Sequence, residues 1–169
     1  MFSEIYKLPL KSTDRTLLLD RDQTIIRDEG YFHDANSVEF LDVKFDFIEL
    51  LYRSNIAVFI ISNQSGIGRG IFELKDSLMV NRAIAQFWSR QGGQLNGSVL
   101  CPHIPQDSCE CRKPKTAMLE MVLSLTGSKK SNSLFIGNSY SDSLAARNAS
   151  IPFLETDESG VRKLLMDWI

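Results

Sequence analysis

Two aspartates stand one residue apart, at Asp20 and Asp22, and a threonine follows at Thr24. Two carboxylates held this close repel one another, and a divalent cation relieves that repulsion. One carboxylate could attack phosphorus as a nucleophile, while the other could donate and accept a proton. Asp-x-Asp also occurs in ordinary solvated turns, so the pair taken alone favours a turn. The motifs in the rest of the chain favour a catalytic role for the two aspartates instead.

A second group of reactive side chains consists of Cys101, His103, Cys109 and Cys111, which lie within eleven residues and include every cysteine of the chain. An odd, clustered set of cysteines is a poor disulfide framework. Cys-x-His followed by Cys-x-Cys supplies four ligands, which is the closed set of a structural zinc site. The alternative is three free thiols that happen to cluster, and we favour zinc. The metal would then fold an otherwise shapeless loop.

Cations and small polar residues form a third group. Arg112 and Lys113 directly follow the cysteines, and bound zinc would fix where they project. Lysine neutralises phosphate charge and arginine binds phosphate through two hydrogen bonds, so we favour function over a surface basic run. Ser62, Asn63 and the glycine-flanked Arg69 could also hold phosphate oxygens. They could equally belong to a strand-to-helix turn and a flexible loop.

Short apolar runs precede these polar residues and predict buried strands. We expect strands at about 15–20, 56–61, 98–100, 133–137 and 151–154. Helical periodicity predicts helices over 43–54, 74–91, 116–125, a stretch beginning at 144–147, and 157–168. Residues 1–14 are expected to be a lead-in without chemistry, and residues 21–39 a loop beside the first strand. Alternating strands and helices predict an α/β fold whose parallel sheet carries the polar residues at its carboxyl edge.

Length and composition limit the classes of protein that fit. The chain has 169 residues, 43% hydrophobic and 24% charged, with a net charge of −2. These values predict a single domain over 1–169, and they argue against nucleic-acid or membrane partners that bind through bulk positive charge. The longest apolar run, 56–61, is too short to span a bilayer, and no signal peptide is evident. We therefore expect a cytoplasmic protein, and a monomer.

Six motifs, in order between residue 15 and about residue 155, resemble the haloacid-dehalogenase-superfamily phosphatases of the heptose-bisphosphate and histidinol-phosphate branch. They are Leu-Asp-Arg-Asp-Gln-Thr at 19–24, Asp-Glu-Gly-Tyr-Phe-His at 28–33, Ser-Asn-Gln-Ser-Gly-Ile-Gly-Arg-Gly at 62–70, Cys-Pro-His at 101–103, Cys-Glu-Cys-Arg-Lys-Pro-Lys at 109–115 and Gly-Asn-Ser-x-x-Asp at 137–142. The first motif belongs to the whole superfamily. The zinc loop that runs into Arg-Lys-Pro narrows the resemblance to this branch.

The resemblance implies a Rossmann-like doubly wound parallel sheet with a minimal cap and a zinc-binding loop. It implies that Asp20 is the nucleophile, that Asp22 is the general acid and base, and that Ser62 and Lys113 hold the transferred phosphoryl group. The implied substrate-binding residues are Thr24, Asn63, Arg69 and Arg112. The implied magnesium ligands are Asp20, the backbone carbonyl of Asp22, and Asn138, with Asp142 supporting the acidic side of the site. Magnesium and zinc are the implied cofactors.

The implied substrate is a phosphorylated sugar. Gly-Tyr-Phe-His at 30–33 and the glycine-rich run at 64–70 resemble the heptose enzymes, whereas the short loop between His103 and Cys109 resembles the histidinol-phosphate enzymes. We favour removal of the 7-phosphate of D-glycero-D-manno-heptose 1,7-bisphosphate, a step toward lipopolysaccharide precursors. The alternatives are a histidinol-phosphate phosphatase and a catalytically impaired homologue that binds a sugar phosphate.

Three residues depart from the pattern of this branch. Gln23 and Ala117 stand where glycines are expected, and a positive φ at Gln23 would be strained. Asn138 stands where the branch has an aspartate that binds magnesium. An amide oxygen can still coordinate but carries no charge, so we expect weaker magnesium binding, partly compensated by Asp142.

Overall fold

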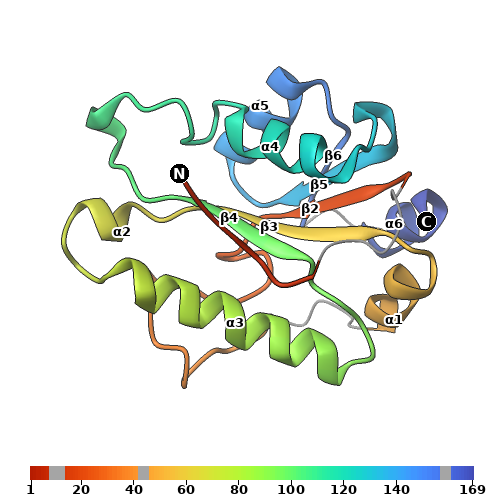
Figure 1. Ribbon diagram of the computed structural model, residues 1–169, viewed down its shortest axis with the longest axis horizontal. Coiled ribbons are helices and arrows are strands. Elements are labelled where there is room, and N and C mark those ends of the chain that lie inside the picture. Colours follow the sequence, from red (N-terminus) through yellow and green to blue (C-terminus); the bar gives the residue numbers. More distant parts are fainter. Residues whose placement is uncertain (8–13, 42–45, 157–160) are drawn as a thin grey trace.

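The computed structural model describes residues 1–7, 14–41, 46–156 and 161–169. Its strands are β1 Phe2–Ile5, β2 Thr16–Leu19, β3 Ala57–Asn63, β4 Gly97–Cys101, β5 Ser133–Gly137 and β6 Phe153–Glu155. Within the described residues these strands form one sheet in the order β1-β4-β3-β2-β5-β6 (Figure 1). β2 lies inside the sheet and pairs in parallel with both β3 and β5. The mostly parallel α/β sheet predicted from the sequence is confirmed.

The edge strand β1 falls where the sequence predicted only a lead-in. It runs antiparallel to β4, with Phe2 opposite Leu100 and Ile5 opposite Gly97. Phe2 and Ile5 are exposed, whereas all four residues of β2 are buried. A strand at the edge of a sheet lacks the continuous apolar run of a central strand, so its sequence carries little signal.

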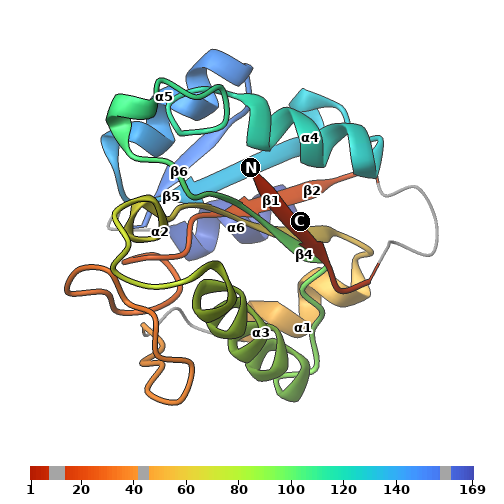
Figure 2. The same ribbon diagram turned by 60° about the vertical axis from the view of Figure 1, so that its left-hand side comes forward.

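Helices cover both faces of the sheet (Figures 1 and 2). They are α1 Asp46–Arg53, α2 Ser65–Gly68, α3 Leu74–Arg90, α4 Ala117–Thr126, α5 Tyr140–Ala149 and α6 Val161–Trp168. On one face Ile48 of α1, Ile84 of α3 and Leu165 of α6 pack with Leu17 and Leu19. On the other face α4 and α5 pack against Leu18 and its neighbours. The alternation of side chains along β2 thus divides the core into two layers.

The helix bounds differ from the predicted ones mainly at the start of α5. α5 begins at Tyr140 rather than near residue 144 because Ser139 caps it: the Ser139 side chain accepts a hydrogen bond from the backbone N–H of Asp142, and Asp142 accepts one from that of Ser139. Residues 43–45 of the first predicted helix and 157–160 of the last lie outside the described residues. None of the described helices has the length and apolar character needed to cross a bilayer.

Candidate active site and metal centre

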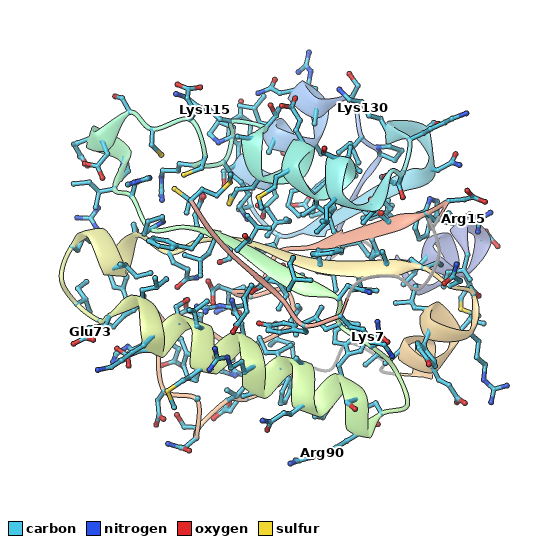
Figure 3. The ribbon with its side chains drawn as sticks, in the orientation of Figure 1. Lys7, Arg15, Glu73, Arg90, Lys115 and Lys130 are labelled. Atoms are coloured by element: carbon cyan, nitrogen blue, oxygen red, sulfur yellow. The ribbon has the colours of Figure 1, made fainter. Side chains whose placement is uncertain are left out.

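The polar residues predicted from the sequence lie at the carboxyl ends of neighbouring parallel strands: Asp20 directly follows β2, whereas Ser62 and Asn63 are the last two residues of β3. Leu19 of β2 lies opposite Ile60 of β3 and Ile136 of β5, so the carboxyl ends of these strands meet at one edge. The backbone N–H of Asp20 donates to the carbonyl of Ile136, at 2.9 Å. The loop 21–41, α2 and the loop 102–116 gather at this edge (Figures 1 and 2). In Figure 3, Arg15 marks the opposite end of the sheet.

Lys113 is the buried cation of this edge and is 4% exposed. Its Nζ lies 2.5 Å from a carboxylate oxygen of Asp20 and 2.6 Å from one of Asp142, and it donates to the carbonyl of Ile61 at 2.9 Å. Burial alone would lower the pKa of this lysine, but the two carboxylates outweigh burial and raise it. Lys113 is therefore held as a cation between two acids.

Asp20 is also buried, and its pKa is raised to about 6. Burial is the main cause, Asp142 and Asp22 add to it, and Lys113 opposes it. Thr24 is buried beside Asp20 and directs its hydroxyl toward the second carboxylate oxygen, at 3.5 Å. Asp20, Asp22, Lys113 and Asp142 will be called the carboxylate cluster. Its three acids outnumber the two cations paired with them, Lys113 and Arg21, and carboxylate oxygens are ligands that magnesium prefers, so the cluster fits a divalent cation.

Asp22 is held at both of its carboxylate oxygens. Arg21 Nε donates to Oδ1 at 2.8 Å, and Gln64 Nε2 donates to Oδ2 at 2.6 Å. The hydroxyl of Ser62 also reaches Oδ2, at 3.3 Å. Sequence reasoning assigned no role to Arg21 or Gln64. Their positions in the sequence could have indicated a role, because Arg21 lies between the two aspartates and Gln64 directly follows Ser62-Asn63.

The other predicted substrate-binding residues make different contacts. Asn63 uses both halves of its amide on the backbone of Lys113: it accepts from the Lys113 N–H at 3.0 Å and donates to the Lys113 carbonyl at 3.2 Å. Arg112 donates to the carbonyl of His103 at 3.2 Å. Arg69 is exposed and directly follows α2. The structure thus gathers Asp20, Asp22, Thr24, Ser62 and Lys113 closely, while Asn63 positions the lysine and the two arginines lie in the surrounding loops.

The structure shows the backbone conformation of Gln23 and the position of Asn138, two of the residues that depart from the family pattern. Gln23 has φ +57°, the conformation for which glycine is the least strained residue. Asn138 follows β5 and is half-buried. One oxygen of Asp142 pairs with Lys113 and the other accepts from Ser139 at 2.7 Å. Both Asp142 oxygens are therefore engaged, and the expectation that Asp142 compensates for Asn138 gains no support from its contacts.

The four residues Cys101, His103, Cys109 and Cys111, called the thiol cluster below, converge at the end of β4. Their ligand atoms all lie within 4.8 Å of one another, and all three cysteines are free thiols. The Sγ atoms of Cys101 and Cys111 are 3.1 Å apart. Burial acts to raise the pKa of Cys109, but hydrogen bonds from the backbone of Arg112 and from the neighbouring cysteines outweigh it and lower the pKa to about 6. This donor set fits one tetrahedral zinc ion.

Known proteins share this architecture. A family model described as polynucleotide kinase 3 phosphatase matches residues 15–159. The D-glycero-alpha-D-manno-heptose-1,7-bisphosphate 7-phosphatase of Campylobacter jejuni is 34% identical over 137 residues, covering 81% of this chain and 78% of that protein. The D-glycero-beta-D-manno-heptose-1,7-bisphosphate 7-phosphatase of Pseudomonas aeruginosa is 34% identical over 150 residues, covering 88% of this chain and 84% of that protein.

Among solved structures, the D,D-heptose 1,7-bisphosphate phosphatase from B. bronchiseptica, complexed with magnesium and phosphate, superposes with a TM-score of 0.78. It is 25% identical to this chain, and the match covers 90% of this chain and 86% of that one. The fold and the relatives agree with the resemblance seen in the sequence. The chain belongs to the haloacid-dehalogenase superfamily of phosphomonoester hydrolases, in the family of the D-glycero-D-manno-heptose-1,7-bisphosphate 7-phosphatases.

Proposed function

We propose that this protein removes the 7-phosphate of D-glycero-D-manno-heptose 1,7-bisphosphate in the synthesis of lipopolysaccharide precursors. The observation that carries the proposal is Asp20, buried at the end of β2 with Lys113 Nζ 2.5 Å from its carboxylate and Asp22 held beside it. The heptose-bisphosphate phosphatases among the relatives support the choice of substrate. They include both alpha and beta forms, so the anomer is a separate question for experiment.

In the proposed mechanism, Asp20 attacks the phosphorus atom. The bond between phosphorus and the sugar oxygen breaks, and Asp22 donates a proton to that leaving oxygen. Asp22 then accepts a proton from a water molecule as the water attacks the aspartyl-phosphate, which releases inorganic phosphate and regenerates Asp20. Lys113 and the Ser62 hydroxyl bind the phosphoryl oxygens. Positioning and charge stabilisation of this kind supply most of the acceleration in phosphoryl transfer.

Two metals complete the proposal. Asp20, the backbone carbonyl of Asp22 and the side-chain oxygen of Asn138 would hold magnesium. When bound, magnesium neutralises charge on the phosphoryl oxygens and on the carboxylates. The thiol cluster would hold a structural zinc ion that fixes the loop from which Arg112 and Lys113 extend.

For the substrate, we propose contacts from Thr24, Asn63, Arg69 and Arg112. Arg112 lies next to Lys113 on the loop of the thiol cluster, and its guanidinium would have to exchange its bond to the carbonyl of His103 for one to substrate. Contact through Asn63 would require one of its two bonds to the Lys113 backbone to be exchanged for one to substrate.

The remaining expectations stay predictions: a single domain over 1–169, a monomer, and no nucleic-acid or membrane partner. A cytoplasmic location is supported by the cysteine set, which is odd in number, clustered, and suited to a metal site rather than to disulfides.

A second candidate function, binding of a sugar phosphate with impaired catalysis, is favoured by Asn138 and by the contacts of Asp142. Asn138 carries no charge where the family has an aspartate, and both oxygens of Asp142 are engaged elsewhere. These facts favour a homologue that binds a sugar phosphate but turns it over slowly. A histidinol-phosphate phosphatase, by contrast, has only the short loop between His103 and Cys109 in its favour.

The test is release of phosphate from heptose bisphosphate and from histidinol phosphate, each with and without magnesium. We expect magnesium-dependent release from heptose bisphosphate alone. Both anomers should be assayed. Fast release from histidinol phosphate would move the assignment to that substrate. If neither substrate is hydrolysed by folded protein, the impaired homologue becomes the better description, and heptose bisphosphate should then still bind in a calorimetric titration.

A further inference from the structure

Arg21 is a completely buried arginine that the mechanism above does not use. It lies between Asp20 and Asp22 in the chain, and its exposed fraction is 0%. A guanidinium in such a position must be paired and hydrogen-bonded, because leaving it unpaired in the interior is very costly. The ion pair with Asp22 Oδ1, at 2.8 Å, supplies the opposite charge.

The other nitrogens of Arg21 connect it to two further parts of the fold. Nη1 donates to Ser77 Oγ at 3.1 Å and points to Asn81 Oδ1 at 3.4 Å, both on α3. Nη2 donates to the carbonyl of Phe32, at 3.2 Å, in the loop that follows the first motif. Arginine has five N–H donors in a rigid fork, so these partners leave the guanidinium almost no freedom to rotate.

Gln64 fixes the other side of the same carboxylate. It is 4% exposed, and its amide nitrogen lies 2.6 Å from Asp22 Oδ2 and 2.7 Å from Ser62 Oγ. Asp22 therefore has a separate donor on each oxygen, one from its own loop and one from the end of β3. A carboxylate held at only one oxygen could still turn about its side-chain bonds.

We propose that Arg21 and Gln64 are positioning residues that hold the carboxylate of Asp22 in place for proton transfer to the leaving oxygen and from water. The proposal rests on the proposed function, in which Asp22 is the general acid and base. General acid–base catalysis requires the group to stand within hydrogen-bond reach of the proton it transfers. The contacts of Arg21 with α3 and with Phe32 make that geometry depend on the loop 28–33 as well as on the catalytic strand.

The leaving group offers a readout that a merely structural role would not change. A sugar alkoxide is a poor leaving group and needs the proton of Asp22, whereas nitrophenolate leaves without one. The ratio kcat/KM reports the steps up to the first irreversible one, which includes departure of the leaving group. Loss of Asp22 positioning should therefore lower kcat/KM for the sugar phosphate much more than for p-nitrophenyl phosphate.

The experiment measures both kcat/KM values, with magnesium present, for wild type, Gln64→Leu, Arg21→Lys and Arg21→Met. Gln86→Leu is the matched control for Gln64→Leu, because Gln86 is exposed on α3. We expect Gln64→Leu and Arg21→Met to lose about a hundredfold on the sugar phosphate, the lower range for general acid–base catalysis, and only about threefold on p-nitrophenyl phosphate. Arg21→Lys keeps the charge without the fork and should lie between Arg21→Met and wild type.

Thermal unfolding of each variant identifies any that fail to fold. If the Arg21 variants fail to fold, Gln64→Leu still tests the proposal, because it removes the other donor to the Asp22 carboxylate. Equal losses on both substrates in a folded Gln64→Leu protein, or no loss on either, would overturn the inference while leaving the phosphatase assignment intact. A wild-type protein that hydrolyses neither ester would overturn both. A combined Gln64→Leu and Asp22→Asn protein should be no slower than Asp22→Asn alone, because both changes remove the same proton transfer.

Discussion

The carboxylate cluster and the thiol cluster both fit metal ions, but they are assembled in opposite ways. The thiol cluster takes all four ligands from one short segment, 101–111, and its ligand atoms lie within 4.8 Å of one another. The carboxylate cluster joins residues from distant parts of the chain: Lys113 and Asp20, 93 residues apart, meet only because the strands bring them to one edge. One cluster contains only metal-ligand side chains, while the other contains a cation of its own.

This difference separates a structural site from a reactive one. Four ligands around one zinc ion leave no open position, so such a site stabilises a loop and performs no chemistry. Burial is the main cause of the raised pKa of Asp20, and the neighbouring acids Asp142 and Asp22 add to it. The three acids exceed their two paired cations, Lys113 and Arg21, by one negative charge, which favours a further cation. The two clusters meet at the segment 111–113, where Cys111 is separated from Lys113 by only one residue. We therefore expect the thiol cluster to act on catalysis through the position of Lys113.

The largest expected effect comes from the proposed nucleophile. Asp20→Asn should lower turnover by at least about a thousandfold, because loss of a nucleophile removes the covalent route, yet the protein should stay folded. Phosphate release and thermal unfolding measure the two consequences. Asp167→Asn, an exposed aspartate of α6, is the control and should keep full activity. Substantial turnover by Asp20→Asn would contradict the proposed mechanism.

Replacing the buried Lys113 tests whether the stability of the protein depends on the cation within the carboxylate cluster. Lys113→Met should lower the free energy of unfolding by about 3–5 kcal/mol, because it leaves the buried carboxylates of Asp20 and Asp142 without the cation that pairs with both. Urea unfolding measures this loss. Adding Asp142→Asn should recover part of the lost stability, since one unpaired charge is removed. Strictly additive losses in the double variant would show that the two side chains do not interact.

Zinc removal tests whether the two clusters are linked. A strong chelator, or Cys111→Ser, should lower the unfolding temperature, and it should also lower kcat because Lys113 is then less well placed. Metal analysis should find one zinc ion per chain in the wild type and less in the variant. Gln106→Ala changes an exposed residue of the same loop and should alter neither the unfolding temperature nor kcat. Full activity in zinc-free protein would show that the thiol cluster stabilises only its own loop.

The smallest effect expected is at the proposed magnesium site. Asn138→Asp adds one ligand charge and should tighten magnesium binding by roughly tenfold, equivalent to about 1.4 kcal/mol. Isothermal titration with magnesium measures this directly, independently of turnover. Asn132→Asp is the matched control, because Asn132 is exposed and directly precedes β5, at the opposite end of that strand from Asn138. An unchanged magnesium affinity would indicate that Asn138 is not a ligand.

The sequence by itself identified the parts of the protein that depend on short spacing. The thiol cluster, the Asp-x-Asp pair and the strand β2 are all visible within a few residues, because metal ligands, neighbouring carboxylates and buried apolar runs have characteristic local patterns. The order of strands and helices then placed the polar residues at one edge of a parallel sheet, since that edge is where such strands end. The motifs also indicated the family that the comparisons confirm.

Only the tertiary structure decided which side chains meet. It gave Asn63 a place on the backbone of Lys113, paired Asp142 with the same lysine, and surrounded Asp22 with Arg21 and Gln64. It also added β1 at the edge of the sheet. Apart from the pair between the adjacent Arg21 and Asp22, these contacts join residues far apart in the chain, and their geometry follows from strand register and helix packing. Residue type alone does not reveal these pairings, because the same arginine, glutamine or asparagine could serve equally well at the surface.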